Sequence, residues 1–113
     1  MLLVTKLTKA TAVSVLLAVG LLTPQPLLLL DEPFDGLDLR QTRDAMRLLR
    51  AHAARGRTLF LSIHQLSDAA LICDRLVLLS GGRVVGEGTL AELRAKANVE
   101  PTAGLEEVFL ALT

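Results

Sequence analysis

The sequence predicts an α/β fold with a largely parallel sheet. Three apolar segments have the length of buried strands, at residues 27–30, 58–63 and 76–79. Stretches with helical spacing or helix-capping residues lie between and after these strands, and such alternation favours parallel pairing. With 113 residues, the chain forms one domain at most.

The N-terminal segment contains an apolar run that predicts a helix. Residues 13–22 are apolar nearly all round, which is typical of a buried helix, and Pro24 and Pro26 end it. Lys6 and Lys9 precede the run, as in the first part of a signal peptide. The run is shorter than the roughly 20 residues that cross a bilayer, and no A-x-A-like cleavage site follows. We therefore expect a buried cytoplasmic helix rather than an export signal.

The first predicted strand lies within L-L-L-L-D-E-P, residues 27–33. Its apolar run does not alternate, and the proline before it and the acidic turn after it favour a buried strand. Asp35-Gly36 indicates a turn, and Asp38 caps a helix that runs to about Arg55. We expect this helix to bury a stripe of residues at helical spacing, made of Leu39, Thr42, Met46, Leu49 and Ala53.

The next strand and helix continue this alternation. Residues 58–63 are apolar and rich in strand-forming residues, and a short helix follows from Ser67 to about Cys73. Residues 76–79 form the third strand. Gly81-Gly82 then turns the chain into an antiparallel hairpin with residues 83–85.

Two short helices are predicted at the C-terminal end. Thr89 and Glu92 have the spacing of a capping box, which opens a helix that runs to about Ala97. Residues 105–112 have amphipathic spacing and form the last helix.

Two adjacent carboxylates follow the first strand. In open parallel sheets, ligands bind at the carboxyl ends of the strands, where Asp31 and Glu32 fall. Such a pair can divide the work of phosphoryl transfer, one acid holding hydrated Mg²⁺ and the other orienting and deprotonating the attacking water. Taken alone, the pair is equally consistent with an acidic turn, and Asp38 with a simple helix cap. His64 lies just past the second strand, where an imidazole is either structural or able to hydrogen-bond a phosphate.

Composition excludes some classes of partner. Twelve basic residues balance twelve acidic ones, and aromatic residues make up 3% of the chain, without Trp or Tyr. Nucleic acid is therefore not an expected partner.

The sequence is unusually hydrophobic. Hydrophobic residues make up 51% and the mean hydropathy is +0.49. These values indicate either a membrane segment or a soluble piece whose apolar faces are covered by further chain. The single cysteine, Cys73, excludes an internal disulfide and fits a reducing cytoplasm.

Four sequence blocks in a fixed order resemble the ATP-binding cassette (ABC) family. They are L-L-L-L-D-E-P at 27–33, D-G-L-D at 35–38, T-L-F-L-S-I-H at 58–64 and C-D-R-L-V-L-L-S-G-G-R-V-V-G-E-G-T-L-A-E-L at 73–93. The match runs from about Leu27 to Leu93 without gaps, and the closing L-E-E-V-F-L-A-L-T is similar to the ends of bacterial ABC exporter ATPases. The resemblance implies an incomplete P-loop NTPase-type fold, a three-layer sandwich whose mostly parallel sheet ends in a C-terminal hairpin.

The resemblance also implies roles for individual residues. Asp31 would be the Walker B aspartate on Mg²⁺, and Glu32 the catalytic base. His64 would be the switch histidine that contacts the γ-phosphate of ATP. The D-loop, which in the family reaches the partner subunit across a head-to-tail dimer, would include Asp35, Gly36 and Asp38.

The sequence departs from the family in its N-terminal part. No G-x-x-x-x-G-K-[ST] phosphate loop occurs in the 113 residues, and the glutamine loop and the adenine-stacking aromatic are absent too. The family's signature, L-S-G-G-Q, aligns with Leu7-Thr8-Lys9-Ala10-Thr11, where Lys9 and Ala10 place side chains that the close approach to phosphate does not allow. We expect this site to be degraded and the chain alone not to hydrolyse ATP measurably.

The leading hypothesis is therefore the C-terminal portion of an ABC-transporter ATP-binding subunit. Residues 1–26 would be a signature-helix remnant, 27–93 the Walker B, D-loop and switch-histidine core, and 94–113 a helical tail. The family implies ATP and Mg²⁺, a membrane permease, a second ATPase subunit and a location on the inner face of the cell membrane. One alternative is a non-catalytic fragment that docks on an intact ABC ATPase. Another is a DNA-repair or translation relative, whose phosphate contacts would come from the arginines at positions 40, 43, 47 and 50.

Overall fold

The computed structural model describes Leu22 and residues 25–113. Leu22 is helical. The rest of the helix predicted at residues 13–22, the lysines at positions 6 and 9 and the Leu7–Thr11 segment lie outside the described residues. Predictions that concern them stay predictions.

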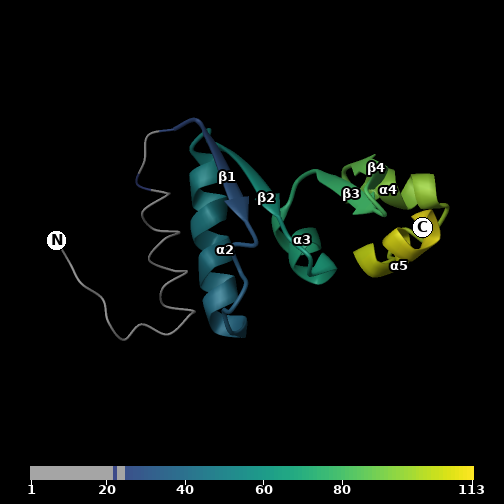
Figure 1. Ribbon diagram of the computed structural model, residues 1–113, viewed down its shortest axis with the longest axis horizontal. Helices are drawn as coiled ribbons and strands as arrows, with labels where there is room; N and C mark the ends of the chain where they lie inside the picture. Colours follow the sequence, from purple (N-terminus) through teal and green to yellow (C-terminus); the bar gives the residue numbers. More distant parts are fainter. Residues whose placement is uncertain (1–21, 23–24) are drawn as a thin grey trace. The chain divides into compact units, whose positions relative to one another are not determined.

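The described residues confirm an α/β fold, and they divide into two compact units between Ile63 and His64. Two short sheets are present in the described part of the chain: a parallel pair, β1–β2, and an antiparallel hairpin, β3–β4. This arrangement is consistent with an incomplete P-loop NTPase fold. The prediction of a single partial domain stays a prediction. In chain order (Figure 1), the elements are β1 (Leu27–Asp31), α2 (Leu39–Ala54), β2 (Thr58–Ser62), α3 (Leu66–Ile72), β3 (Leu76–Ser80), β4 (Arg83–Gly88), α4 (Leu90–Ala97) and α5 (Leu105–Leu112).

The first unit consists of the parallel pair and α2, which lies beside it (Figure 1). In the ladder, Leu29 lies opposite Phe60 and Asp31 opposite Ser62. Burial alternates along both strands, so that one face of the pair is partly covered and the other is exposed. On the exposed face, Leu29 is 68% and Phe60 is 62% accessible. The prediction that both strands are buried is therefore wrong for this face.

Helix α2 begins and ends where the sequence predicts. The Asp38 side chain accepts a hydrogen bond from the Gln41 backbone N–H at 2.8 Å, and the Gln41 side chain accepts one from the Asp38 N–H at 3.0 Å, which completes a capping box. The predicted buried stripe is only partly correct. Thr42 and Leu49 are buried, but Leu39 is 72% exposed, because it lies in the first turn beyond the edge of the packed face.

The second unit contains a continuous apolar core. The hairpin contributes its alternate residues Leu76 and Leu78, while Val77 and Leu79 point outward. Gly81 and Gly82 both adopt positive φ, 57° and 75°, as the tight turn between the strands requires. Helices α3, α4 and α5 supply the other buried side chains, which are Ala69, Ile72, Leu93, Leu105 and Val108.

The C-terminal helices confirm their predicted boundaries. The Thr89 hydroxyl caps α4 by accepting from the Glu92 N–H at 3.2 Å. α4 ends at Ala97, and the left-handed backbone of the C-cap residue Asn98 (φ 55°) closes the helix. α5 spans Leu105–Leu112.

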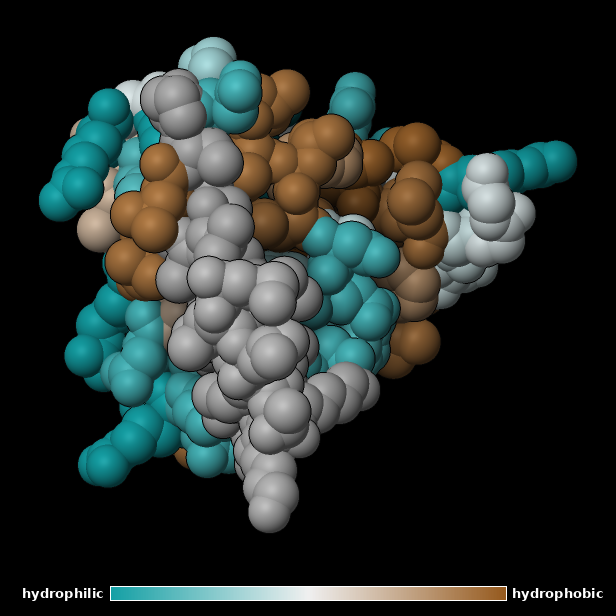
Figure 2. All heavy atoms as spheres, turned by 60° about the vertical axis from the view of Figure 1, so that its left-hand side comes forward, coloured by the Kyte–Doolittle hydropathy of each residue, from teal (hydrophilic) through white to brown (hydrophobic). Residues whose placement is uncertain are grey.

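Several large apolar side chains reach the surface, and Figure 2 shows brown hydrophobic residues beside teal hydrophilic ones. No helix within the described residues is both long and apolar enough to cross a bilayer.

Candidate functional site

The two predicted acids lie at the carboxyl end of the parallel pair. Asp31 is the last residue of β1, and its register partner Ser62 is the last residue of β2. Asp31 and Glu32 are both exposed. Asp31 therefore lies at the carboxyl end of the strand pair and Glu32 directly follows it, the position at which open sheets bind ligands.

Glu32 has an unusual backbone conformation. Its φ of 46° lies in the left-handed region, which is unfavourable for residues other than Gly, Asn and Asp. Its N–H donates to the Ser62 carbonyl at 2.8 Å and approaches the Ser62 hydroxyl oxygen at 3.1 Å. The hydrogen bonds across the strand pair hold the strained residue.

Ser62 is the residue that sequence reasoning missed. Its hydroxyl donates to Asp31 Oδ1 and accepts from the Glu32 N–H, so it contacts both members of the acidic pair. A serine at the end of an apolar strand is common, and its importance appears only when the register with β1 is known. The only hint in the sequence is that a polar residue ends an apolar strand shortly before His64.

The turn after Glu32 leads directly into α2. The Glu32 carbonyl accepts from the Asp35 N–H at 3.1 Å, and the Phe34 carbonyl accepts from the Leu37 N–H at the same distance. Gly36 adopts a φ of 81°, which a residue with a side chain would adopt only with strain. Asp38 then caps α2. These contacts account for the local structure of the predicted D-loop, and its nucleotide contacts stay a prediction.

His64 is the first residue of the second unit and is exposed. It precedes α3, which begins at Leu66. Its convergence with Asp31 and Glu32 on one phosphate stays a prediction.

The oxygen atoms at the strand edge could coordinate a hard cation, such as Mg²⁺, that keeps most of its bound water molecules. Among the described residues, no group of three or more His, Cys, Asp or Glu side chains gathers into a metal cluster. Mg²⁺ does not require such a cluster, because it keeps several waters and binds one or two carboxylates together with substrate phosphates. Asp31, with the Ser62 hydroxyl beside it, offers oxygen ligands of this kind.

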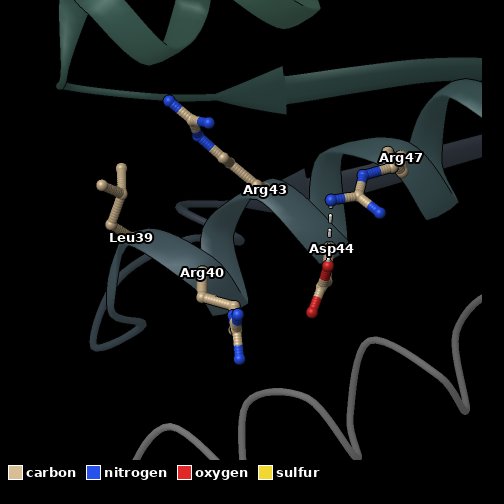
Figure 3. Close-up of a pocket in the computed structure, with 5 residues that line it drawn as sticks. All are labelled: Leu39, Arg40, Arg43, Asp44 and Arg47. Atoms are coloured by element: carbon tan, nitrogen blue, oxygen red, sulfur yellow. Dashed lines mark ion pairs between the residues drawn. The ribbon is translucent and has the colours of Figure 1, made fainter.

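A separate depression of about 300 Å³ lies on α2 and contains none of the predicted site residues. Figure 3 shows the Arg40 and Arg43 side chains diverging from the helix, while Arg47 forms an ion pair with Asp44 at 3.4 Å. Diverging guanidinium groups do not form a common anion site, and exposed ion pairs stabilise little. We interpret this surface as a solvated helix face.

Comparison with known proteins identifies relatives over most of the chain. No protein-family model matches it. The thiamine import ATP-binding protein ThiQ of Jannaschia sp. is 44% identical over 88 residues, which cover 77% of this chain and 38% of the relative. The Nod factor export ATP-binding protein I of Neorhizobium galegae is 42% identical over 72 residues, which cover 64% of this chain and 21% of that protein. The chain thus spans well under half the length of these relatives.

A solved structure supports the same relationship. The ATP-binding subunit of an ABC transporter matches with a TM-score of 0.84 and 32% identity, over 94% of this chain and 44% of that one. The homologues are ABC transporter ATP-binding proteins, and the chain matches the C-terminal part of their nucleotide-binding domain. One named relative serves import and the other export, so the similarity to exporter ends does not decide the direction of transport.

Proposed function

We propose that this chain, as a homologue of ABC transporter ATP-binding proteins, supplies the metal-binding and water-activating edge of an ATPase site that drives membrane transport. The observation that carries the proposal is the position of Asp31 and Glu32 at the carboxyl edge of β1–β2, each in contact with Ser62. An acidic pair held in this way can bind a hydrated cation and a water molecule side by side.

The two acids take different roles in this proposal. Asp31, with one oxygen engaged by Ser62, would hold Mg²⁺ directly or through water. The ion would neutralise charge on the β- and γ-phosphates of ATP. Glu32 would orient the attacking water and accept its proton. His64 would hydrogen-bond the γ-phosphate, and the residues from Asp35 to Asp38 would reach the second ATPase subunit.

Phosphate binding and transport require further parts. The 113 residues contain no G-x-x-x-x-G-K-[ST], so we propose that a phosphate loop reaches the strand edge from additional chain or from another subunit. The proposal includes a membrane permease, a head-to-tail pair of ATPase subunits and a location on the inner face of the cell membrane. The exposed face that carries Leu29 and Phe60 supports additional cover for this sheet.

A hybrid cassette tests the catalytic proposal. The N-terminal portion of the thiamine import relative is joined to residues 27–113 of this chain, to supply the phosphate loop that the family implies. We expect Mg²⁺-dependent ATP hydrolysis by the hybrid and none by the 113-residue chain alone. Glu32→Gln should lower kcat by at least about 100-fold, the scale of a lost general base, while ATP binding is kept.

Two outcomes would contradict the proposal. In the first, the hybrid binds ATP but Glu32→Gln leaves its turnover unchanged. In the second, the 113-residue chain hydrolyses ATP by itself and Glu32→Gln abolishes that turnover, which would keep the role of Glu32 but contradict a phosphate loop supplied by additional chain or another subunit. The matched control is Glu107→Gln in α5, the same change at an exposed helical position, which should leave hydrolysis unchanged.

A second candidate function is docking without catalysis. In this alternative α5 is the docking helix and Leu110, which is 73% exposed, is the apolar side chain on it that a partner would cover. In this case the chain would co-elute with an intact relative's ATPase and inhibit it, and Leu110→Ser would weaken both effects. A chain that stays monomeric beside the intact ATPase counts against docking.

A further inference from the structure

We propose that Ser62 is a positioning residue that sets the Asp31 carboxylate and the Glu32 backbone for cation and water binding. What the two acids do rests on the proposed function. The contacts of Ser62 stand independently of it.

A single hydroxyl contacts both acids. A serine hydroxyl has one donor and two acceptor sites, and Ser62 uses both kinds. It donates to Asp31 Oδ1 and accepts from the Glu32 N–H at 3.1 Å. Its proton points toward the carboxylate, so its lone pairs are free to face the amide, and the two contacts reinforce each other.

The contact to Asp31 is of the strong, charge-assisted kind. It restricts rotation of the carboxylate and occupies Oδ1, which leaves Oδ2 for a metal ion or for a water molecule bound to it. The contact to Glu32 supports a left-handed residue whose backbone is strained. Ser62 therefore acts on the site through both neighbours and needs no contact with ATP.

Because of the position of Ser62, its hydroxyl can be removed by mutation without disturbing the fold. The residue ends β2 and is exposed, so a β-branched replacement fits the strand without crowding a core. Thr and Val have nearly the same shape and differ in the hydroxyl. Ser62→Thr keeps the donor and acceptor, and Ser62→Val removes both.

The test uses the full 113-residue chain labelled for NMR, with Mn²⁺ alone as the probe. Without metal, the Asp31 carboxyl ¹³C resonance should move in Ser62→Val and stay near its wild-type position in Ser62→Thr. On titration, Mn²⁺ should broaden the Asp31 and Glu32 signals. The Mn²⁺ concentration for half-broadening should rise about tenfold in Ser62→Val and stay within about twofold of wild type in Ser62→Thr, on the scale of one charge-assisted hydrogen bond. Signals of α4 and α5 serve as internal references.

Each outcome decides the proposal. Equal carboxyl shifts and equal Mn²⁺ midpoints in the Thr and Val variants would overturn it. Ser62→Ala is the second hydroxyl-free variant, and loss of β1–β2 pairing in both Ala and Val variants would show a structural role in place of a positioning one. If Mn²⁺ broadens neither acid in the wild type, the metal role in the proposed function fails, while the carboxyl ¹³C comparison still decides the role of Ser62.

Discussion

Replacing Glu32 by glycine should stabilise the folded chain, although it removes the proposed catalytic base. Glu32 has a φ of 46°, and a left-handed conformation costs a non-glycine residue about 1–2 kcal/mol. Glycine adopts this region freely but gives the unfolded chain more conformational entropy, worth about 0.5–1 kcal/mol. The difference predicts a net gain of about 0.5–1 kcal/mol, or about 2–4 °C in Tm.

Thermal unfolding followed by far-UV circular dichroism measures this gain, because the chain has no Trp or Tyr for fluorescence. Two control variants set the scale. Among the residues that the structure describes, Asn98 is the other non-glycine residue with positive φ, and Asn98→Gly should alter Tm little because asparagine tolerates that conformation. Ala51→Gly lies inside α2 with ordinary helical geometry and should destabilise by about 1 kcal/mol.

The sign of the Tm change in Glu32→Gly decides whether the Glu32 backbone is strained in solution. If Glu32→Gly lowers Tm as Ala51→Gly does, the left-handed strain at Glu32 is absent in solution, and the position of its carboxylate needs another explanation. If Tm rises, the chain keeps a destabilising residue at this point, which is expected where a side chain is retained for function rather than for stability.

Three further predictions concern α2. Asp38→Ala should destabilise the fold by about 1–2 kcal/mol, whereas Asp38→Ser, which keeps a capping oxygen opposite Gln41, should cost less than about 0.5 kcal/mol; urea denaturation separates the two. Leu49→Ala should cost about 2–5 kcal/mol in the same assay, because Leu49 is 0% exposed and its removal leaves a cavity. Arg43→Ala should change the free energy of unfolding by less than about 0.5 kcal/mol, and a larger loss would contradict the interpretation of the arginine surface as a solvated face.

Features that depend on neighbours in the sequence were predicted well. Asp38 and Gln41 are three residues apart, and that spacing is sufficient for the α2 cap. The Gly81-Gly82 turn needs only two residues that accept positive φ, so the hairpin follows from the local sequence. The boundaries of α5 likewise follow from its helical spacing.

Features that depend on packing partners were not predicted. A continuous apolar run indicates that a strand can be buried on both faces, but it does not say what covers each face. In the described residues, α2 lies beside the β1–β2 pair, and Leu29 remains exposed on one face of that pair. The prediction that Leu39 is buried was wrong for a related reason. Helical spacing places Leu39 near the buried stripe, but its position in the first turn takes it past the packed surface.

The acidic pair was predicted from its type and position, but the means of holding it was not. Asp31 and Glu32 follow an apolar strand, and the rule that ligands bind at carboxyl ends is sufficient to select them. Ser62 is 31 residues from Asp31 along the chain, and their contact depends on the exact parallel register. A shift of one residue would turn the Ser62 side chain to the other face of the sheet and remove it from both acids.

The geometry of Glu32 is therefore conditional on strand pairing. Its left-handed backbone costs about 1–2 kcal/mol, and each hydrogen bond to Ser62 contributes about 0.5–1.5 kcal/mol net, so the two effects nearly cancel. Neither the turn from Asp35 to Leu37 nor the cap of α2 supplies a hydrogen bond to the Glu32 N–H, which donates to the carbonyl and hydroxyl oxygens of Ser62. When β2 separates from β1, the Glu32 N–H loses both of these acceptors. The parallel pair thus contributes the hydrogen bonds that hold the Glu32 backbone beside Asp31.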